Sequence, residues 1–476
     1  MTTSEVPSSS WARARAREAL AGARPGVYWL DDPSRPEALP ALSGDSTADL
    51  VVVGGGFSGL WTALLAAERD PGRRIVLLEA GRCGDQASGR NGGFAAPSLT
   101  HGFANGQARW SEELDRLDQL GSANLAAIGE TVARRDIDCN FERVGELTVA
   151  ARPHEAADLA ELAEQMQAAG HAARLLDRVE VRAELDSPSY LAGLFEPGVA
   201  LVEPARLAWG LRQACLAAGV VVHEHTRVRH VGREGTTMVV RSDAGAVRAR
   251  QVALATNAFP PLLRRLRLMT VPVYDYVLMT EPLSPAQRTA IGWRHRQGVG
   301  DASNSFHYYR LTRDDRILWG GYDAVYYYGS RIDPRLEQHG PTHELIAQHF
   351  FETFPQLEGL RFTHRWAGVI DTCTRFSAFF GTAYRHQVAY ALGYTGLGVA
   401  ATRFGAEVML DLLAGEETER TSLRMVRERP LPFPPEPFRA AGINLTRRAM
   451  MRADAEGGRR NLWLRALDRA GLGFDS

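Results

Sequence analysis

The chain has 476 residues, of which 45% are hydrophobic and 23% charged; this composition is typical of soluble globular proteins, and the length predicts two or three domains. A formal net charge of −1 lacks the basic excess that phosphate binding needs, which argues against nucleic acid as a partner. No apolar stretch is long enough for a transmembrane helix, and no apolar signal core follows the N-terminus, so we expect a cytoplasmic protein without a membrane partner.

Residues 1–45 mix Ser, Pro, Ala and Arg, and we expect them to form an N-terminal arm. The apolar run 49–53 after it predicts a buried parallel strand. It leads into a G-x-G-x-x-G turn formed by Gly54, Gly56 and Gly59, and residues 60–68 then predict a helix. Such glycines permit a tight turn, close approach to a pyrophosphate and close packing of helix on strand.

A second predicted strand, residues 75–79, ends in Glu79, which follows Gly54 by 25 residues. A carboxylate at this distance can accept hydrogen bonds from the ribose hydroxyls of a bound dinucleotide. Strand, glycine turn, helix, second strand and acid occur in the expected order, and together they favour dinucleotide binding. A glycine-rich turn in an ordinary α/β domain is the alternative.

The remaining elements alternate between helical and strand patterns. Residues 110–185 show amphipathic helical patterns, including 156–169, and a βα pattern resumes at 202. Further strands are expected at these positions: 145–150, 220–225, 251–257, 271–280, 306–310, 317–322 and 387–392. A glycine-rich turn, 393–398, precedes a helix at 399–414, and the proline-rich segment 429–437 leads to a helical tail.

This order predicts an α/β fold (α+β overall) with a Rossmann-like cofactor domain and a second domain built on an antiparallel sheet. The expected boundaries make the cofactor domain discontinuous. They are 1–45 for the arm; 46–110 with 196–265 and 362–428 for the cofactor domain; 111–195 with 266–361 for the substrate domain; and 429–476 for the linker and tail.

Four segments together resemble the FAD-dependent amine and amino-acid oxidases of the D-amino-acid oxidase superfamily, the group that includes glycine and sarcosine oxidases. They are the fingerprint with Glu79, Ala87–Gly93, Ala255–Asn257 and Gly393–Gly398. The Ser-Gly-Arg-Asn-Gly-Gly sequence within the second segment looks most like the γ-glutamylputrescine oxidase group.

The resemblance implies FAD as cofactor and a set of residues that would contact it. Ser88 to Gly93 are mostly small and would let backbone lie against the isoalloxazine, although a surface loop is the alternative. Thr256 would pass the phosphates, or form a bare turn, and Val228 would meet adenine. The helix after Gly398 would place its positive end at the reduced flavin. The expected cofactor residues are Gly54, Gly56, Phe57, Ser58, Gly59, Glu79, Ala80, Arg82, Ser88, Gly89, Arg90, Asn91, Gly92, Gly93, Val228, Thr256, Gly368, Gly393, Gly396, Leu397 and Gly398.

The resemblance also implies substrate residues in the aromatic strands. Tyr276 matches a substrate-facing tyrosine of sarcosine-oxidase-like members, and Tyr274 would share its strand face by period two. Trp319 and Asp323 fall where those members carry an oxygen-activating lysine and a nearby histidine. Asp323 is a candidate for binding a substrate ammonium, or it is simply solvated, and Trp319 with Tyr308 could hold a cation or belong to the core. Arg90 and Arg310 could bind a substrate carboxylate.

Two departures from the family pattern bear on mechanism. All 55 basic residues are arginine, so the oxygen-activating lysine has no counterpart here. Covalently flavinylated members carry a cysteine at the position of Gly368, five residues before Cys373. We therefore expect non-covalent FAD and no metal. The other three cysteines, Cys83, Cys139 and Cys215, are scattered and form no C-x-x-C pair, which is typical of free buried thiols.

The predicted function is oxidation of the C–N bond of a small amine or amino acid to an imine by hydride transfer to flavin N5, with hydrolysis and reoxidation by O2. A dehydrogenase that uses another acceptor is one alternative. An FAD-dependent aromatic monooxygenase is a second, since residues 300–302 (Gly-Asp-Ala) resemble that group's second phosphate motif. A catalytically silent nucleotide-binding protein is the third.

Overall fold

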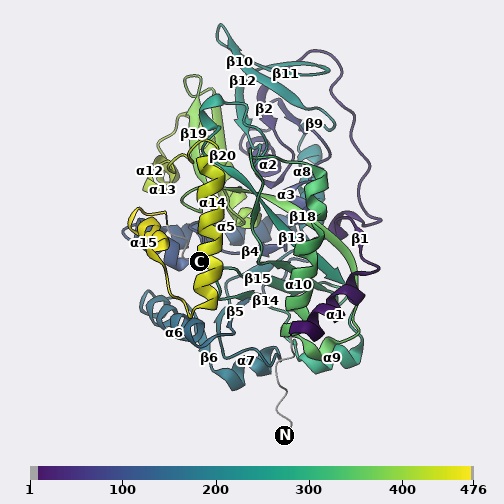
Figure 1. Cartoon of the computed structure of the whole chain (residues 1–476). Helices are drawn as coiled ribbons and strands as arrows, with labels where there is room; N and C mark the ends of the chain where they lie inside the picture. Colours follow the sequence, from purple (N-terminus) through teal and green to yellow (C-terminus); the bar gives the residue numbers. More distant parts are fainter. Residues whose placement is uncertain (1–8, 473–476) are drawn as a thin grey trace.

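Two β-sheets organise the chain, whose computed structural model describes residues 9–472. An eight-stranded sheet lies in the upper half of the molecule and a ten-stranded sheet in the lower half (Figure 1). A two-stranded ribbon, β4 (Phe94–Ala95) with β8 (Ala200–Leu201), completes the strands of the described part.

The eight-stranded sheet has the order β10-β11-β12-β2-β3-β9, with β20 pairing to β12 and β19 to β20. Its centre is parallel: β12, β2, β3 and β9 run the same way, and β20 runs parallel to β12. Such strands are buried on both faces, which explains their nearly continuous apolar sequences. The strands are β2 (Ser46–Val53), β3 (Ile75–Leu78), β9 (Val221–His223), β10 (Val228–Glu234), β11 (Thr237–Ser242), β12 (Gly245–Leu254), β19 (Phe379–Ala383) and β20 (Val388–Leu392).

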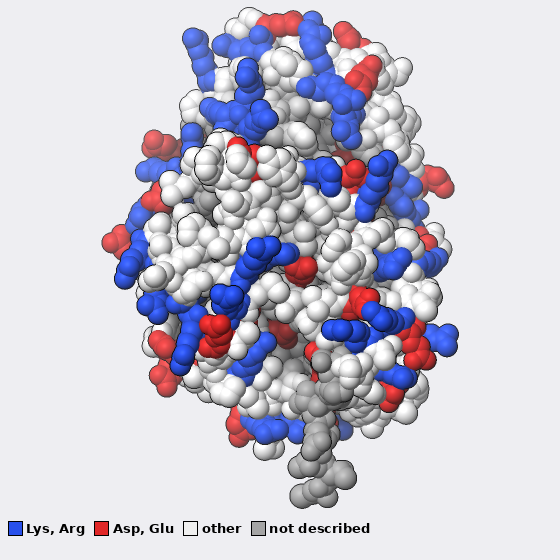
Figure 2. Space-filling view, viewed as in Figure 1, with Lys and Arg blue, Asp and Glu red and all other residues white. Residues whose placement is uncertain are grey.

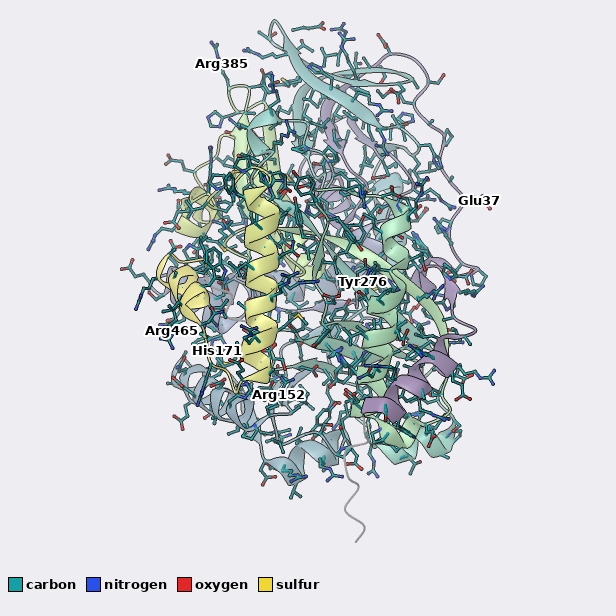
Figure 3. All side chains as sticks on the ribbon, viewed as in Figure 1. Glu37, Arg152, His171, Tyr276, Arg385 and Arg465 are labelled. Atoms are coloured by element: carbon teal, nitrogen blue, oxygen red, sulfur yellow. The ribbon has the colours of Figure 1, made fainter. Side chains whose placement is uncertain are left out.

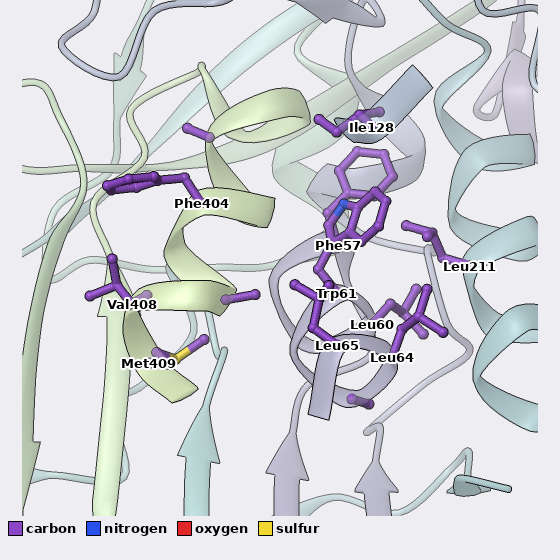
Figure 4. Packing of buried hydrophobic residues seen from close by; sticks show 14 of the residues in the cluster. Phe57, Leu60, Trp61, Leu64, Leu65, Ile128, Leu211, Phe404, Val408 and Met409 are labelled. Carbon is purple, nitrogen blue, oxygen red and sulfur yellow. The ribbon is translucent and has the colours of Figure 1, made fainter. Parts of the chain in front are cut away.

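One helix, α2 (Phe57–Arg69), is the packing centre of this half. Figure 4 shows its apolar side chains between α11 (Gly398–Ala414) and α8 (Pro204–Ala217). Trp61 and Leu64 of α2 are fully buried there, as are Val408 of α11 and Leu211 of α8. Burying large apolar side chains contributes about 1.5–3 kcal/mol each, so α2 is held firmly on its strand.

The ten-stranded sheet has the order β1-β18-β13-β16-β15-β14-β5-β7-β6, with β17 beside β13. It is mainly antiparallel, with parallel pairs only between β1 and β18 and between β5 and β14 among the described strands. The strands are β1 (Arg24–Pro25), β5 (Glu146–Ala150), β6 (Arg174–Leu176), β7 (Ala192–Glu196), β13 (Val271–Thr280), β14 (Gly298–Asp301), β15 (His307–Leu311), β16 (Ile317–Gly321), β17 (Val325–Tyr326) and β18 (Phe362–Thr372).

One face of this sheet packs on α10 (Gly340–Thr353), and α1 (Ser9–Leu20) packs on α10 in turn. The other α-helices are α3 (Ala87–Arg90), α4 (Phe103–Trp110), α5 (Leu114–Arg134), α6 (Pro153–Ala168), α7 (Arg178–Glu184), α9 (Pro285–Ile291), α12 (Glu419–Ser422), α13 (Arg424–Arg427), α14 (Phe438–Ala455) and α15 (Leu462–Arg469). Short 3-10 turns are η1 (Tyr28–Leu30), η2 (Arg264–Leu266), η3 (Pro334–Gln338) and η4 (Pro355–Leu357).

The predicted α/β class with a Rossmann-like sheet and a second sheet is confirmed. The expected boundary at residue 362 differs from the structure, because β18 pairs with β13 and so belongs to the ten-stranded sheet. The arm also contains more structure than its composition suggested, since it includes α1 and β1. Residues 1–8 of the expected arm and 473–476 of the expected tail lie outside the described residues.

No helix within residues 9–472 combines the length and the apolar character that crossing a bilayer requires. Arginine and acidic side chains are interspersed over the face shown in Figure 2, in keeping with the net charge of −1.

Candidate functional site

A cavity of about 1570 Å³ extends between the two sheets. Its walls include the glycine turn after β2, the turn before α11, several strands of the ten-stranded sheet and the C-terminal helices. A cavity of this size, built where parallel strands end, is the usual place for a ligand in α/β folds.

The turn after β2 requires its glycines for steric reasons. Gly54 has φ +110°, and a Cβ there would lie 2.3 Å from the carbonyl oxygen of Ala255. A Cβ on Gly59 would lie 1.8 Å from the carbonyl oxygen of Gly54. A Cβ on Gly56 would meet only the hydroxyl of Ser88, at 2.8 Å. Gly54 and Gly59 thus hold helix against strand, while Gly56 keeps the mouth of the turn open.

The N-terminus of α2 faces the cavity through this opening. Its N-cap is Gly56, which has no side chain to cap the first turn, and the Phe57 N–H donates to Ser88 Oγ at 2.8 Å. The positive end of a helix with uncapped N–H groups can bind an anion such as a pyrophosphate.

Glu79 also faces the cavity. It accepts hydrogen bonds from the N–H groups of Gly55 (2.6 Å) and Gly81 (2.7 Å). Burial raises the pKa of Glu79, while these two N–H groups oppose the shift. The carboxylate therefore fixes the turn as well as offering an acceptor to a ligand.

The segment Ser88–Gly93 does not form an open loop, because its first part is the single helical turn α3. The Asn91 side chain donates to the carbonyl oxygen of Ala87 (2.8 Å) and accepts from the N–H of Gly93 (2.8 Å). Trp29 Nε1 donates to the carbonyl oxygen of Asn91 at 3.0 Å. The backbone of this cradle is thus held in one conformation where it lines the cavity.

The turn before α11, which also lines the cavity, is tied to a buried acid. Asp371 Oδ2 accepts from the N–H of Gly393 at 2.5 Å, and burial raises the pKa of Asp371 to about 7. Gly396, Leu397 and Gly398 line the cavity, so the N-terminus of α11 opens on it.

Most of the expected cofactor residues lie at this cavity. All of them line it except Gly59, Gly89 and Gly393, which act in the packing of the turns that do. Thr226, Arg227 and Arg229, beside the expected Val228, also line it, as does the segment from Phe259 to Leu262, which the sequence patterns did not single out.

The structure places the expected substrate residues Tyr274, Tyr276 and Trp319 away from the cavity, which corrects that assignment. Trp319 is fully buried, and its Nε1 donates to the carbonyl oxygen of Ile346 on α10 (2.9 Å). Tyr276 lies beside α10 (Figure 3), where the His343 ring is 5.3 Å away. The Tyr274 hydroxyl donates to the carbonyl oxygen of Asp333 at 3.3 Å.

The reason is the two-residue period of a strand. The strand β13 was predicted with its correct bounds, but Val273 and Asp275 face the cavity, while Tyr274 and Tyr276 face α10. A shift of one residue moves every side chain to the opposite face of a sheet. The same holds on the hairpin β15–β16, where Tyr308 faces the cavity and Trp319 the core.

The cavity face of the sheet therefore carries a different pair, Asp275 and Tyr308. The Tyr308 hydroxyl donates to Asp275 Oδ2, and both residues line the cavity. Gly320 lies beneath the Tyr308 ring, and Gly368 is the strand partner of Asp275. Asp275 was missed because the aromatic residues on either side of it carried the stronger signal.

Asp323 and Arg310, two other candidates, do not line the cavity. Asp323 accepts from Arg447 Nη1 (2.6 Å) and from the Thr342 hydroxyl (3.0 Å), so it anchors α14 instead of binding a substrate ammonium. Arg310 is fully buried and donates to the carbonyl oxygen of Val202 at 2.6 Å.

Arg90 lines the cavity, but its guanidinium is already paired. Nη1 lies 2.7 Å from Glu337 Oε2, and Nε donates to the carbonyl oxygen of Asp85 at 2.7 Å. It is therefore not available as a simple carboxylate ligand.

The C-terminal segment forms one wall of the cavity, which sequence patterns did not indicate. Helix α14 crosses the front of the molecule from one sheet to the other (Figure 1). Besides the Arg447–Asp323 pair, Asp454 on α14 accepts from Asn304 Nδ2 (2.6 Å) and from the N–H of Ser305 (3.0 Å). The expected tail is thus part of the site.

Two alternatives from the sequence meet structural objections. Gly300 and Asp301 lie at the end of β14, and Asp301 accepts from His307 Nδ1 (2.8 Å) instead of opening a phosphate-binding turn. Cys373 is buried, with Sγ donating to the carbonyl oxygen of Ser377 at 3.1 Å, and it does not line the cavity, whereas Gly368 does.

Comparisons with known proteins identify the family of the chain and relatives of its fold. Residues 49–412 match the family described as DAO, FAD dependent oxidoreductase. The chain is 32% identical to gamma-glutamylputrescine oxidoreductase of Escherichia coli (strain K12) over 401 residues, covering 82% of this chain and 89% of that protein. It is 29% identical over 408 residues to the probable oxidoreductase OrdL of Haemophilus influenzae, covering 83% and 89%. The fold is similar to glycine oxidase from Geobacillus kaustophilus, with a TM-score of 0.66, 21% identity and coverage of 79% and 96%.

Proposed function

The chain belongs to the DAO family of FAD-dependent oxidoreductases, and on that premise we propose that it oxidises the C–N bond of a small amine or amino acid. Relatives whose names specify such substrates support this substrate class. They include gamma-glutamylputrescine oxidoreductase and glycine oxidase of Pseudomonas aeruginosa, 31% identical over 243 residues.

The observation that carries the proposal is the fit of the cavity to a dinucleotide. A side chain at Gly56 would enter the mouth of the turn, and the N–H groups of α2 behind it suit a pyrophosphate. Glu79 would bind the ribose, Val228 would contact adenine, and the backbone of Ser88–Gly93 would support the flavin ring. These assignments extend to Gly396, Leu397 and Gly398 at the N-terminus of α11, whose helix dipole favours negative charge.

We further propose that FAD is held without a covalent bond. Gly368, at the position of the attachment cysteine in flavinylated relatives, lines the cavity and has no sulfur. The nearest cysteine in sequence, Cys373, points into its own packing with Ser377 and Gly393.

FAD held by these residues would supply the two-electron redox chemistry of the oxidation, and an electron acceptor would complete the cycle. With O2 as acceptor, a primary amine, dioxygen and water would give a carbonyl compound, ammonia and hydrogen peroxide, one molecule of each. The protein's own contribution is to hold the amine nitrogen and the C–H bond in one orientation. Because the chain has no lysine, a fast oxygen reaction must use another group, and a non-oxygen acceptor stays the second candidate.

The test is an anaerobic screen of amines and amino acids against the purified yellow protein, followed at the oxidised-flavin absorbance. We expect bleaching by at least one class, and release of free FAD on acid or heat denaturation. Admitting O2 then separates the acceptors, because an oxidase recovers its colour with formation of hydrogen peroxide. Protein that carries no flavin, or flavin that no amine or amino acid bleaches, would contradict the proposal.

The proposed compartment is the cytoplasm. All four cysteines are free and buried, which suits a reducing environment.

A further inference from the structure

Asp275 is a carboxylate inside the molecule that opens on the cavity and has no cationic partner. No arginine or histidine forms an ion pair with it within residues 9–472. Its partners are neutral: the Tyr308 hydroxyl and the backbone N–H groups of Gly321 and Tyr276. An ionised carboxylate removed from water is costly unless it is paired, so a cationic ligand would bind here favourably.

The pair lies against the cradle that would support the flavin. A Cβ on Gly92 would meet the Tyr308 ring at 2.8 Å, so the ring packs directly on the backbone of this segment. Gly368, the strand partner of Asp275, lies beside Arg90 of the same segment. Asp275 thus lies at the junction between the cofactor cradle and the sheet that faces it.

The arginines that line the cavity here are already engaged. Arg90 is paired with Glu337 and Arg447 with Asp323 (2.6 Å), while Arg439 donates to the Ser330 hydroxyl (2.7 Å). A ligand carboxylate near Asp275 would therefore meet a like charge without a ready counter-ion. Like charges in such an environment disfavour binding.

We propose that Asp275 binds the ammonium group of the substrate, accepts one of its protons before the neutral amine is oxidised, and selects amines that carry no carboxylate on the carbon next to nitrogen. The Tyr308 hydroxyl donates to Oδ2 and so fixes the orientation of the Asp275 carboxylate, which lines the cavity. This inference rests on the proposed function, because it treats the bound amine as the substrate. Its test measures binding and needs no turnover.

The experiment measures equilibrium binding to the FAD-loaded protein by calorimetry. Two probes lack a hydrogen on the carbon next to nitrogen and so cannot be oxidised: tert-butylamine, and α-aminoisobutyrate, which adds a carboxylate. The variant is Asp275→Asn, which keeps shape and removes charge. The matched control is Asp315→Asn, on the β15–β16 hairpin outside the cavity, where φ is +60° and asparagine is tolerated.

We expect the parent to prefer tert-butylamine over α-aminoisobutyrate. Asp275→Asn should weaken tert-butylamine binding about 30-fold or more, without weakening that of α-aminoisobutyrate. Asp315→Asn should change neither. Parent protein that prefers α-aminoisobutyrate, or Asp275→Asn protein that keeps its FAD and binds tert-butylamine within about threefold of the parent, would overturn the inference.

A second measurement uses the parent protein and stays decisive if Asp275→Asn fails to fold. Burial raises the pKa of Asp275 to about 6, against the opposing hydrogen bond from Tyr308. The cation needs the ionised form, so affinity for tert-butylamine should fall about tenfold per pH unit below this value. The Arg90–Glu337 ion pair is the charged group packed beside this position. Affinity that is constant down to pH 4.5, with FAD still bound, would contradict the role of Asp275.

The two proposals fail in different ways. If no amine bleaches the flavin yet tert-butylamine binding depends on Asp275, the cation site stands and the proposed reaction falls. If amines are oxidised and Asp275→Asn leaves binding unchanged, the reaction stands and the cation site falls.

Discussion

The two sheets present their functional groups to the cavity in different ways. The eight-stranded sheet offers mainly backbone: the N–H groups of α2, the cradle at Ser88–Gly93 and the turn before α11. The ten-stranded sheet offers side chains from one face, led by Asp275 and Tyr308. Where backbone groups form the site, the glycines that they require can be recognised in the sequence. The face to which a strand side chain points can be assigned only when the register of the strand is known.

The largest expected effect tests the backbone groups that the eight-stranded sheet and its turns present to the cavity. Gly59→Ala would place a Cβ 1.8 Å from the carbonyl oxygen of Gly54, so helix and strand would have to separate. We expect the protein to lose its FAD, measured as released flavin per chain. The control is Gly340→Ala at the start of α10, where a Cβ meets nothing within 4 Å. Full flavin occupancy in Gly59→Ala would show that FAD binding does not depend on the close packing of α2 on its strand.

The next largest effect concerns the face of the ten-stranded sheet that packs on α10. Trp319 is fully buried between Tyr309 and α10, so Trp319→Ala should lower the free energy of unfolding by about 3–5 kcal/mol. Chemical denaturation measures this loss. Trp463→Ala, at a position on α15 that is 36% exposed, is the matched control and should cost far less. A small loss of unfolding free energy in Trp319→Ala, together with a changed reoxidation rate of the flavin, would indicate that the Trp319 side chain faces the cavity.

On the cavity face, Tyr308→Phe should act on ligand binding more than on stability. Removing the hydroxyl takes away a hydrogen bond that lowers the pKa of Asp275. The pH below which tert-butylamine binding fades should therefore rise, by about one pH unit. Titration calorimetry across pH 5–8 measures the shift. An unchanged pH profile would mean that the hydroxyl does not control the carboxylate.

The smallest effect concerns the wall of the cavity that the C-terminal segment forms. Arg447→Ala removes the ion pair that ties α14 to Asp323, and because the pair is partly exposed we expect a loss of about 1 kcal/mol or less. Limited proteolysis should detect earlier cleavage between residues 429 and 472. Arg452→Ala, on the exposed side of the same helix, is the control. Equal protection in both variants would show that the pair does not hold α14 in place.

Sequence patterns predicted the glycine turn beside the eight-stranded sheet in detail because its residues are constrained locally. Gly54 and Gly59 are dictated by contacts with Ala255 and with each other, and Glu79 by the N–H groups of its own turn. These requirements fall within short segments of chain, so spacing alone reveals them.

The cavity face of the ten-stranded sheet was predicted less well because its assignment depended on packing between distant segments. The strand β13 was predicted with its correct bounds, yet Tyr276 lies under α10, which comes more than sixty residues later. Nothing in the period of a strand says which face a later helix will cover. Likewise, the place of Asp323 follows from Arg447, a residue of the tail, which no spacing rule connects to it.

The pairing of β12 with both β2 and β20 has a consequence for how the protein folds. Val53 lies beside Leu254, and Leu254 beside Tyr390, so the centre of one sheet joins three widely separated parts of the chain. Most of the other sheet lies between them in sequence, so no continuous fragment contains one sheet without the other. Long-range pairing of this kind slows folding, since each loop must close before its contacts form. We expect the two halves to unfold in a single transition, and a chain cut between β13 and β18 to release no half that folds alone.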